Sequence, residues 1–261
     1  MLYLVATPIG NLKEITYRAI EILQSVDYIA CEDTRTSRTL LEHYGINKKL
    51  ISYHKFNESK VSESIMQDLK NGLNIAIISD AGMPGISDPG SVVINALINE
   101  GLDYTVISGP SAFTNAFVLS GYPTPFTFVG FLPENNKKKN ELLENLRQIN
   151  STLIFYCSPH NLEEDLKCLN NALGNREICV VREISKKFEE VTFSDLETGF
   201  TGTLKGEFVV LVKFKDEKME INIDKNMQTL LDMGLTKTEA SKVIAKLTGT
   251  KKSDVYKNAI K

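Results

Sequence analysis

Several features that define other protein classes are missing from this chain of 261 residues. It has no tryptophan, and its four cysteines (Cys31, Cys157, Cys168 and Cys179) form neither a CxxC pair nor a zinc-like pattern with histidine. We therefore expect buried, reduced thiols and no disulfide framework or metal site. No apolar run approaches the ~20 residues that span a bilayer, and residues 1–6 lack the basic segment of a signal peptide. These absences predict a cytoplasmic protein without a membrane segment.

Common phosphate-binding and nucleophile motifs are also missing. The segment around Gly82 and Gly85 lacks the Gly-Lys-Ser/Thr of a P-loop, and no Gly-x-Gly-x-x-Gly follows the first predicted strand. There is no Gly-x-Ser-x-Gly elbow, and the three histidines are scattered. Loops rich in backbone amides, small residues and single carboxylates suit a zwitterionic adenosine compound better than a triphosphate.

Charge is distributed unevenly along the chain. Its 30 Lys and Arg against 33 Asp and Glu give a net charge of −3, yet residues 225–261 carry 8 basic and 3 acidic side chains. A basic C-terminal segment that follows an acidic stretch of chain favours the binding of a polyanion to this segment. A solvated, lysine-rich helix face would give the same count, so charge alone leaves both interpretations open.

Residues 75–90 are the most informative stretch. The apolar run Ile75-Ala76-Ile77-Ile78 predicts a strand that is buried on both faces of a parallel sheet. Three glycines, two prolines and two aspartates follow, and after Gly90 apolar residues return at helical spacing. A strand, a glycine-rich loop and a helix in this order build a ligand crevice in open α/β sheets. An ordinary βα loop would have the same pattern, so the loop alone does not decide.

Apolar runs alternate with helical patterns through the first 121 residues. Strands are predicted at residues 2–6, 28–30, 50–53, 75–78 and 104–107. The alternation predicts a parallel α/β sheet. A polar cluster follows each strand, and the carboxyl ends of parallel strands meet at one edge of a sheet. We therefore expect the five clusters to converge.

Two further parts are predicted downstream. Tyr122-Pro123-Thr124-Pro125 marks a boundary, since two prolines suit an extended connection, and the strand-like runs beyond it predict a second, mixed α/β domain. Residues 213–224 have the composition of a linker. The predicted domains are therefore 1–121, 122–215 and a basic helical segment, 225–261.

Short helices are expected in the C-terminal segment. Thr236 and Glu239 have the spacing of a capping box. Apolar faces are predicted for two helices there, and their members are Ala240, Val243, Ile244 and Leu247 in one helix and Val255, Tyr256 and Ala259 in the next.

Five motifs occur in order in the first 121 residues: Thr7-Pro8-Ile9-Gly10-Asn11-Leu12, Glu32-Asp33-Thr34-Arg35, His54-x-x-Asn57-Glu58, residues 79–90 and Gly109-Pro110-Ser111-Ala112. Together they resemble the small-subunit ribosomal RNA cytidine 2′-O-ribose methyltransferases, a branch of the tetrapyrrole methylase superfamily. The resemblance covers nearly the whole chain and continues through Gly130-Phe131-Leu132-Pro133, Phe155-Tyr156, Arg182-Glu183 and Lys205-Gly206-Glu207.

The resemblance implies a fold, a cofactor and a substrate. The expected fold is α/β, with two domains of the tetrapyrrole methylase type, S-adenosylmethionine in the cleft between them, and a small C-terminal helical segment. The implied assembly is a homodimer, and the implied substrate is the 2′-hydroxyl of cytidine 1402 in the 16S rRNA of the small ribosomal subunit. The cofactor contacts carried over from the family are Pro8, Gly10, Asp80, Ala81, Gly82, Ser108, Gly109, Pro110, Ser111, Tyr156 and Cys157.

This sequence departs from the family pattern at three positions. Cys157 stands where an acidic residue is expected, Asn161 where arginine or a similar residue is expected, and Met83 where threonine is more usual. The cysteine weakens any role for a carboxylate at that position.

The clusters after the second and third strands supply candidates for activating the ribose hydroxyl. A hydroxyl is a poor nucleophile near neutral pH, so a general base contributes ~10²–10⁴-fold. The candidates are Glu32, Asp33, Arg35, His54, Asn57 and Glu58. Glu32 or Asp33 is the preferred proton acceptor, Arg35 a clamp for phosphate or carboxylate, and His54 the second-choice base. A helix N-terminus capped by Thr34 would also explain residues 32–35, and His54 also suits a structural hydrogen bond.

Two other functions stay open on the sequence alone. A methyltransferase acting on a tetrapyrrole such as uroporphyrinogen or a precorrin would use the same cofactor site, although the basic segment and residues 32–35 argue against it. A non-catalytic ribosome-binding protein would retain that site as a relic.

Overall fold

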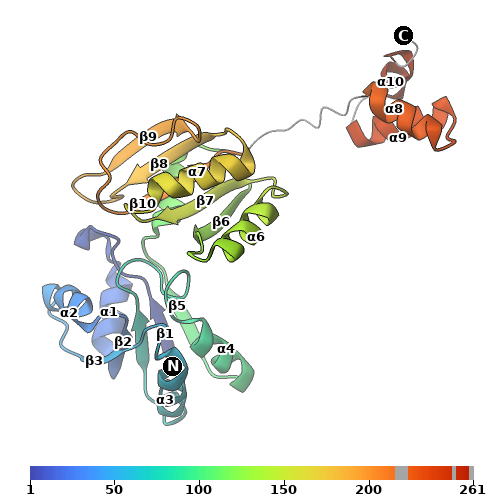
Figure 1. Ribbon diagram of the computed structural model, residues 1–261. Coiled ribbons are helices and arrows are strands. Elements are labelled where there is room, and N and C mark those ends of the chain that lie inside the picture. Colours follow the sequence, from blue (N-terminus) through green and yellow to red (C-terminus); the bar gives the residue numbers. More distant parts are fainter. Residues whose placement is uncertain (215–222, 249–250, 259–261) are drawn as a thin grey trace. The chain divides into compact units, whose positions relative to one another are not determined.

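The computed structural model describes residues 1–214, 223–248 and 251–258. The chain forms two compact units, Met1–Phe214 and Lys215–Lys261 (Figure 1). No described helix is long and apolar enough to cross a membrane.

The first part of unit 1 is built on five strands and the helices between them. The strands are β1 (Leu2–Val5), β2 (Tyr28–Cys31), β3 (Lys49–Ser52), β4 (Ile75–Ile78) and β5 (Tyr104–Ile107), and the helices are η1 (Leu12–Glu14), α1 (Tyr17–Ser25), α2 (Thr34–His43), α3 (Glu58–Lys70) and α4 (Ser91–Glu100). All the strands are parallel, in the order β3-β2-β4-β1-β5. Helices α1 and α2 cover one face and α3 and α4 the other. The predicted parallel sheet is confirmed, and β2 and β4 are buried at every residue.

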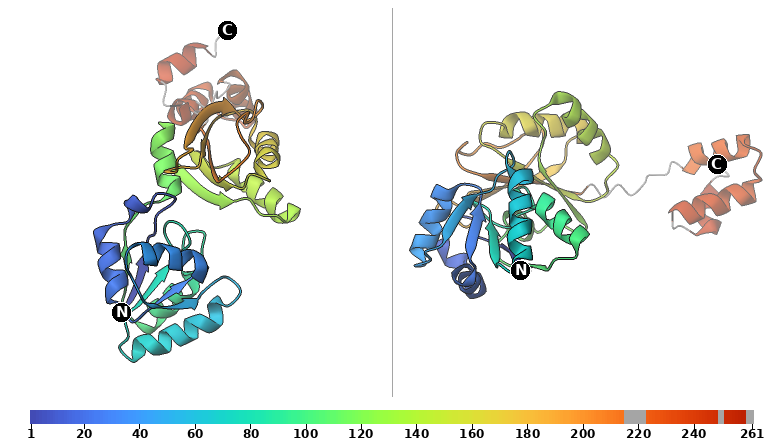
Figure 2. Two further views of the ribbon diagram at one scale, coloured as in Figure 1. Left: turned by 90° about the vertical axis from the view of Figure 1, so that its left-hand side faces the viewer. Right: turned by 90° about the horizontal axis from the view of Figure 1, so that it is seen from below.

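The second part of unit 1 has a mixed sheet. Its strands are β6 (Phe126–Phe131), β7 (Thr152–Cys157), β8 (Glu177–Arg182), β9 (Glu190–Asp195) and β10 (Phe208–Val212), and its helices are α6 (Asn136–Leu146) and α7 (Leu162–Leu173). The order is β6-β7-β10-β8-β9; β6 and β7 are parallel, and the other neighbouring pairs are antiparallel. Figure 2 shows both sheets from two further directions.

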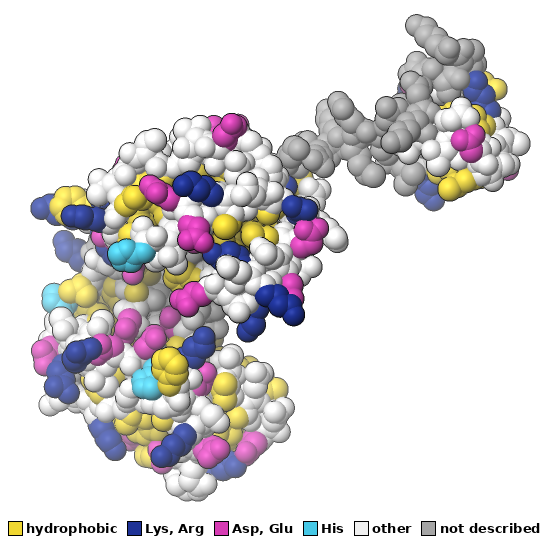
Figure 3. Space-filling view, in the orientation of Figure 1, with side chains coloured by type: hydrophobic (Ala, Val, Ile, Leu, Met, Phe, Trp, Pro, Cys, Tyr) yellow, Lys and Arg dark blue, Asp and Glu magenta, His cyan; other side chains and the backbone are white. Residues whose placement is uncertain are grey.

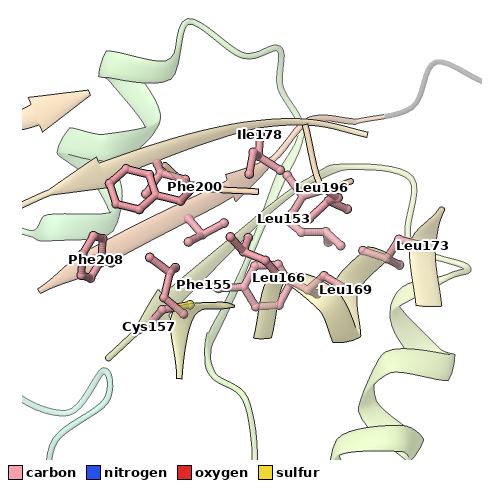
Figure 4. Close-up of a cluster of buried hydrophobic side chains, with 14 of the residues drawn as sticks. Leu153, Phe155, Cys157, Leu166, Leu169, Leu173, Ile178, Leu196, Phe200 and Phe208 are labelled. Carbon is pink, nitrogen blue, oxygen red and sulfur yellow. The ribbon is translucent and has the colours of Figure 1, made fainter. Parts of the chain in front are cut away.

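Strand β7 separates two apolar cores because successive side chains point to opposite faces of a sheet. Phe155 and Cys157 lie in the core beneath α7, together with Leu166 and Leu169 (Figure 4). Ile154 and Tyr156 lie on the other face.

That other face is covered by α5 (Ala112–Ser120), which falls within the predicted first domain, residues 1–121. Ala116 packs in one cluster with Ile154 and Val209 of the second sheet. The predicted boundary at residue 121 lies between the two sheets. Helix α5 precedes this boundary, yet its side chains pack against the second sheet.

The described part of unit 2 contains α8 (Ile223–Asp232), α9 (Lys237–Thr248) and α10 (Lys252–Asn258). The capping box is confirmed: a Glu239 carboxylate oxygen accepts from the Thr236 amide at 2.9 Å, and the Thr236 hydroxyl accepts from the Glu239 amide at 3.4 Å. The predicted apolar faces are only partly right, because Val243 and Tyr256 are 38% and 37% exposed. Three short helices enclose a small core, so apolar side chains at its margin stay in solvent.

Some predictions fall on parts of the chain that the structure does not describe. Residues 215–222 of the predicted linker, which include the end of the predicted second domain, lie outside the described residues, as do the side chain of Leu247 and all of Ala259.

Candidate active site

A pocket of about 390 Å³ is lined by residues from both parts of unit 1. Six of the residues predicted to bind the cofactor line it, namely Asp80, Ala81, Gly82, Ser111, Tyr156 and Cys157. The loops after β1, β4 and β5 reach the pocket from the carboxyl edge of the first sheet, so three of the five expected clusters meet there. No residue of the clusters after β2 and β3, residues 32–35 and 54–58, lines the pocket. The second sheet contributes the ends of β6 and β7 and the start of β10.

The loops after β1 and β4 are fixed to each other by hydrogen bonds. Thr7 and Gly82 exchange two backbone hydrogen bonds, at 2.9 and 3.1 Å. The Thr7 hydroxyl donates to the Ser79 carbonyl at 3.1 Å, and the Ser79 hydroxyl donates to the Gly82 carbonyl at 3.1 Å. Gly82 has a φ of +82°, and a Cβ there would lie 3.3 Å from Cγ2 of Ile9. The glycine therefore permits both the turn and the close approach of the two loops.

Five predicted cofactor residues do not line this pocket: Pro8, Gly10, Ser108, Gly109 and Pro110. A Cβ on Gly109 would lie 2.7 Å from the Cβ of Ala6, and one on Gly10 would lie 2.3 Å from Cγ of Lys186. Gly109 is therefore needed for the close approach of the loops after β1 and β5, whereas Gly10, which is exposed and has a φ of +143°, is next to the flexible side chain of Lys186. A sequence motif identifies the loops that build the pocket. It does not show which residues of a loop face the ligand and which ones only support the loop.

The pocket has a mostly apolar lining and a negative potential. Asp80 and Asp88 line it, as does Glu207, whose carboxylate pairs with Lys186 at 2.7 Å, and none of the lining residues is a lysine, arginine or histidine. Burial raises the pKa of Asp80 and of Asp88, although a hydrogen bond from Ser79 partly offsets the effect on the pKa of Asp88. In Figure 3, acidic side chains gather around the hollow between the two parts of unit 1. Such a pocket suits a cation with an apolar body.

Tyr156 and Cys157 face opposite sides of β7. Tyr156 lines the pocket and contacts the rings of Phe128 and Phe131, at centroid distances of 5.0 and 5.5 Å. The Cys157 side chain is 3% exposed and lies in the core beneath α7 (Figure 4). Burial and the neighbouring carboxylate of Asp165 raise the pKa of this thiol, so it stays protonated. Cys157 therefore meets the pocket through its backbone.

Asp33 and Arg35 are bound to each other. The Asp33 carboxylate accepts from the Arg35 amide and from its guanidinium, both at 2.8 Å. These bonds lower the pKa of Asp33 to about 2. Asp33 is thus the cap of α2, and the expectation that Thr34 would cap this helix is wrong. The Asp33 amide donates to Asp80 at 3.1 Å, which links this cluster to the pocket.

Glu32 has a different environment from its neighbour. Its pKa is raised by burial first and then by the negative charges of Asp88 and Asp80, while His54 acts in the opposite direction. Glu32 therefore lies within electrostatic reach of both the pocket and the cluster after β3. Nδ1 of His54 is buried and has no hydrogen-bond partner among the described residues.

Asn57 and Glu58 make internal contacts. The Asn57 side chain accepts from the His54 amide at 2.8 Å and donates to the Ser52 carbonyl at 3.0 Å. A Glu58 carboxylate oxygen accepts from the Gly90 amide at 2.8 Å and from the Tyr53 hydroxyl at 3.1 Å. These contacts favour positioning roles, in which Asn57 shapes the loop that carries His54 and Glu58 anchors the end of the glycine-rich loop.

Several residues at the site escaped the sequence prediction. Phe131 and Glu207 line the pocket, and both belong to motifs quoted above, so a signal was present. Phe56 is 96% exposed, and its ring centroid lies 6.1 Å from that of His54. No pattern in the sequence distinguishes this phenylalanine from one in the core.

Comparisons with known proteins agree with this geometry. The family model described as "Tetrapyrrole (Corrin/Porphyrin) Methylases" matches residues 1–198. The chain is 40% identical to "Ribosomal RNA small subunit methyltransferase I" of Halalkalibacterium halodurans, over 98% of this chain and 93% of that protein. It is 46% identical to the protein of the same name from Mycoplasmopsis pulmonis, over 82% of this chain and 98% of that protein.

Solved structures give the fold independently. A crystal structure of diphthine synthase matches with a TM-score of 0.65 at 14% identity and covers 82% of this chain and 90% of that one. The predicted fold class is thereby confirmed. The chain belongs to the tetrapyrrole methylase family and, within it, to the group of proteins named ribosomal RNA small subunit methyltransferase I.

Proposed function

We propose that this protein transfers the methyl group of S-adenosylmethionine to the 2′-hydroxyl of cytidine 1402 in the 16S rRNA of the small ribosomal subunit, acting as a cytoplasmic homodimer. The observation that carries the proposal is a pocket lined by apolar and acidic residues and linked through Asp80 to residues 32–35. The names of the full-length relatives supply the acceptor.

The residues of the pocket fit S-adenosylmethionine. Its sulfonium makes the methyl group a strong electrophile. Asp80 and Asp88 offset the positive charge, and Ile9 and Tyr156 offer apolar surface to the adenosine. Backbone groups at Gly82 and Cys157 supply polar contacts that fix orientation, as few and well-placed polar groups do in small-molecule sites.

Glu32 is the proton acceptor in this proposal. Its partly buried carboxylate has a raised pKa, which makes it a stronger base than its neighbour. Asp33 is unsuited, because both of its oxygens are occupied by Arg35 and its pKa is lowered to about 2. Asp33 instead positions Arg35, whose side chain is 90% exposed and free to meet an RNA phosphate.

The protein also has to hold the nucleotide in line with the methyl group, which contributes much of the rate in a reaction of this kind. Phe56 and His54 lie on the loop after β3, on the same edge of the sheet as Glu32. An aromatic ring that is almost fully exposed is suited to stack on an unpaired base, which is how proteins commonly hold single-stranded RNA.

A methyl-transfer assay with isotope-labelled S-adenosylmethionine tests the proposal. The acceptors are undermethylated small ribosomal subunits, naked 16S rRNA and uroporphyrinogen. We expect label on the small subunit, at a single cytidine whose linkage resists alkali because its 2′-hydroxyl is methylated. Label on uroporphyrinogen alone would show that the acceptor is wrong, and bound cofactor without transfer to any acceptor would favour a binding protein.

A further inference from the structure

Residues 223–248 and 251–258, called the module below, are folded around a core of their own. Met227, Ala240, Ile244 and Val255 are buried together and come from all three helices. The turn after α8 is closed by hydrogen bonds from Gly234 to the Leu231 carbonyl and from Leu235 to the Leu230 carbonyl, and the capping box starts α9. The basic residues of this segment are thus displayed on a structure and not on an extended tail.

Four lysines lie on the surface of this module. Lys242 and Lys246 are four residues apart and so share one face of α9, and Lys251 and Lys252 lie at the start of α10. All four are exposed, and none forms an ion pair with another described residue. Three carboxylates lie in the same part of the chain: Glu239 accepts from Thr236, Asp232 accepts from Gln228 at 2.8 Å, and Asp254 accepts from Ser253 at 3.2 Å. The described lysines outnumber these carboxylates, so basic charge remains in excess.

An aromatic ring accompanies these lysines. Tyr256 is 37% exposed, and the ammonium group of Lys237 lies 5.6 Å from the centre of its ring. Lys252 precedes Tyr256 by one helical turn, so it shares the same side of α10. Lys237 and Lys252 thus lie on the side of Tyr256, and lysines that neutralise phosphates near a ring on which a base can stack are a usual combination in nucleic-acid surfaces. Lys242 and Lys246 add basic charge on another face of α9.

The comparisons differ in how much of this chain they cover. The relative from M. pulmonis is matched over 98% of its own length but over only 82% of this chain, which is the share that residues 1–214 make up. The diphthine synthase structure also covers 82%, whereas the H. halodurans relative covers 98%. The pocket lies wholly within residues 1–214. The chemistry is therefore complete without the module.

We propose that residues 223–258 bind RNA phosphates and serve to hold the ribosomal substrate while unit 1 methylates it. The inference rests on the proposed rRNA acceptor. Tethering a second binding site raises the effective concentration of the substrate at the first without any new contact there. The module therefore lowers KM and leaves kcat unchanged.

The test uses the full chain with Lys242, Lys246, Lys251 and Lys252 all changed to Gln. Each lost phosphate contact reduces the slope of log affinity against log salt by about 0.7–0.9, so four contacts reduce it by about 3. We expect KM for undermethylated small subunits to rise at least roughly tenfold at moderate salt, as this slope implies, with kcat unchanged. Tyr256→Ala should weaken binding further, and Tyr256→Phe should not.

Two control variants accompany the test. Changing the same four lysines to Arg keeps the charge and should keep KM. Lys49→Gln with Lys60→Gln removes two exposed lysines from unit 1 and should leave both constants unchanged. Circular dichroism melting shows whether the module stays folded, which we expect because the substituted side chains are exposed.

An unchanged KM and salt slope in the quadruple Gln variant would overturn the inference, and so would a loss confined to kcat. Co-sedimentation with small subunits separates this result from a failure of the proposed function. If the unaltered protein transfers no methyl group to rRNA, its salt-dependent co-sedimentation still reports on the module. Loss of that binding in the Gln variant supports the inference, and its retention overturns it.

Discussion

Glu32 and Asp33 are neighbours in the chain, yet their carboxylates have opposite properties. The pKa of Glu32 is raised by burial and by the charges of Asp88 and Asp80, whereas the pKa of Asp33 is lowered to about 2 by its bonds with Arg35. The sequence left the two equivalent, because neither burial nor a hydrogen-bond partner can be inferred from adjacent acidic residues. We propose Glu32 as the base because its carboxylate accepts no hydrogen bond from the described residues, whereas both oxygens of Asp33 accept from Arg35.

Glu32→Gln should lower the rate of methyl transfer ~10²–10⁴-fold, the usual contribution of a general base. A base must be deprotonated to act, so the rate of the unaltered protein should rise with pH through a pKa above the ordinary range of glutamate, and then level off. Single-turnover rates measured across this pH range would show the rise in the unaltered protein and its absence in the variant.

Asp33→Asn is the matched control for this substitution. It should change the melting temperature little, because asparagine caps a helix about as well as aspartate and the lost ion pair with Arg35 is exposed, and it should retain the pH dependence. Calorimetry should show that both variants bind S-adenosylmethionine, whereas Asp80→Ala should bind it more weakly. A pH-dependent limb that survives in Glu32→Gln would assign the base to another group, with His54 as the next candidate.

At the scale of the elements, the parallel sheet was predictable and the pocket was predictable only in part. Continuous apolar runs such as residues 75–78 identify strands that are buried on both faces. Helix α5 was assigned to the wrong core because its apolar residues fit either sheet, and only the tertiary packing selects the second one. Likewise, Gly109 belongs to a recognisable motif, but its role in packing depends on Ala6.

Gly82→Ala should lower the affinity for S-adenosylmethionine. A side chain at a φ of +82° costs about 1–2 kcal/mol, and its Cβ would press on Ile9 in the wall of the pocket. A loss of about 1.4 kcal/mol in binding corresponds to tenfold in Kd. Isothermal titration calorimetry measures this effect, with the melting temperature recorded in parallel.

Gly45→Ala supplies the control for backbone strain. Gly45 also has a positive φ, +66°, but a Cβ there meets nothing within 4 Å. This variant should lose stability and keep its affinity for the cofactor. If the two variants bound the cofactor equally well, the close approach of the loops after β1 and β4 would not be what shapes the site.

At the scale of the whole molecule, the residues that line the pocket come from both sheets of unit 1. A ligand held in this way stabilises the closed protein against every opening that would separate the residues of its site. At a concentration of 100 Kd the stabilisation is about 2.7 kcal/mol, which slows exchange through such openings roughly 100-fold. The described part of unit 2 has a small core of its own and supplies none of these lining residues, so its openings should not respond.

Hydrogen–deuterium exchange with and without S-adenosylmethionine measures this difference. Protection should increase around residues 79–88 in the first part of unit 1 and around 156–159 and 207–209 in the second, and α8, α9 and α10 should be unchanged. Protection limited to the first sheet would show that the second sheet does not hold the cofactor. The methyl-transfer site would then be built by the loops after β1, β4 and β5 alone, and the role given to Tyr156 would be wrong.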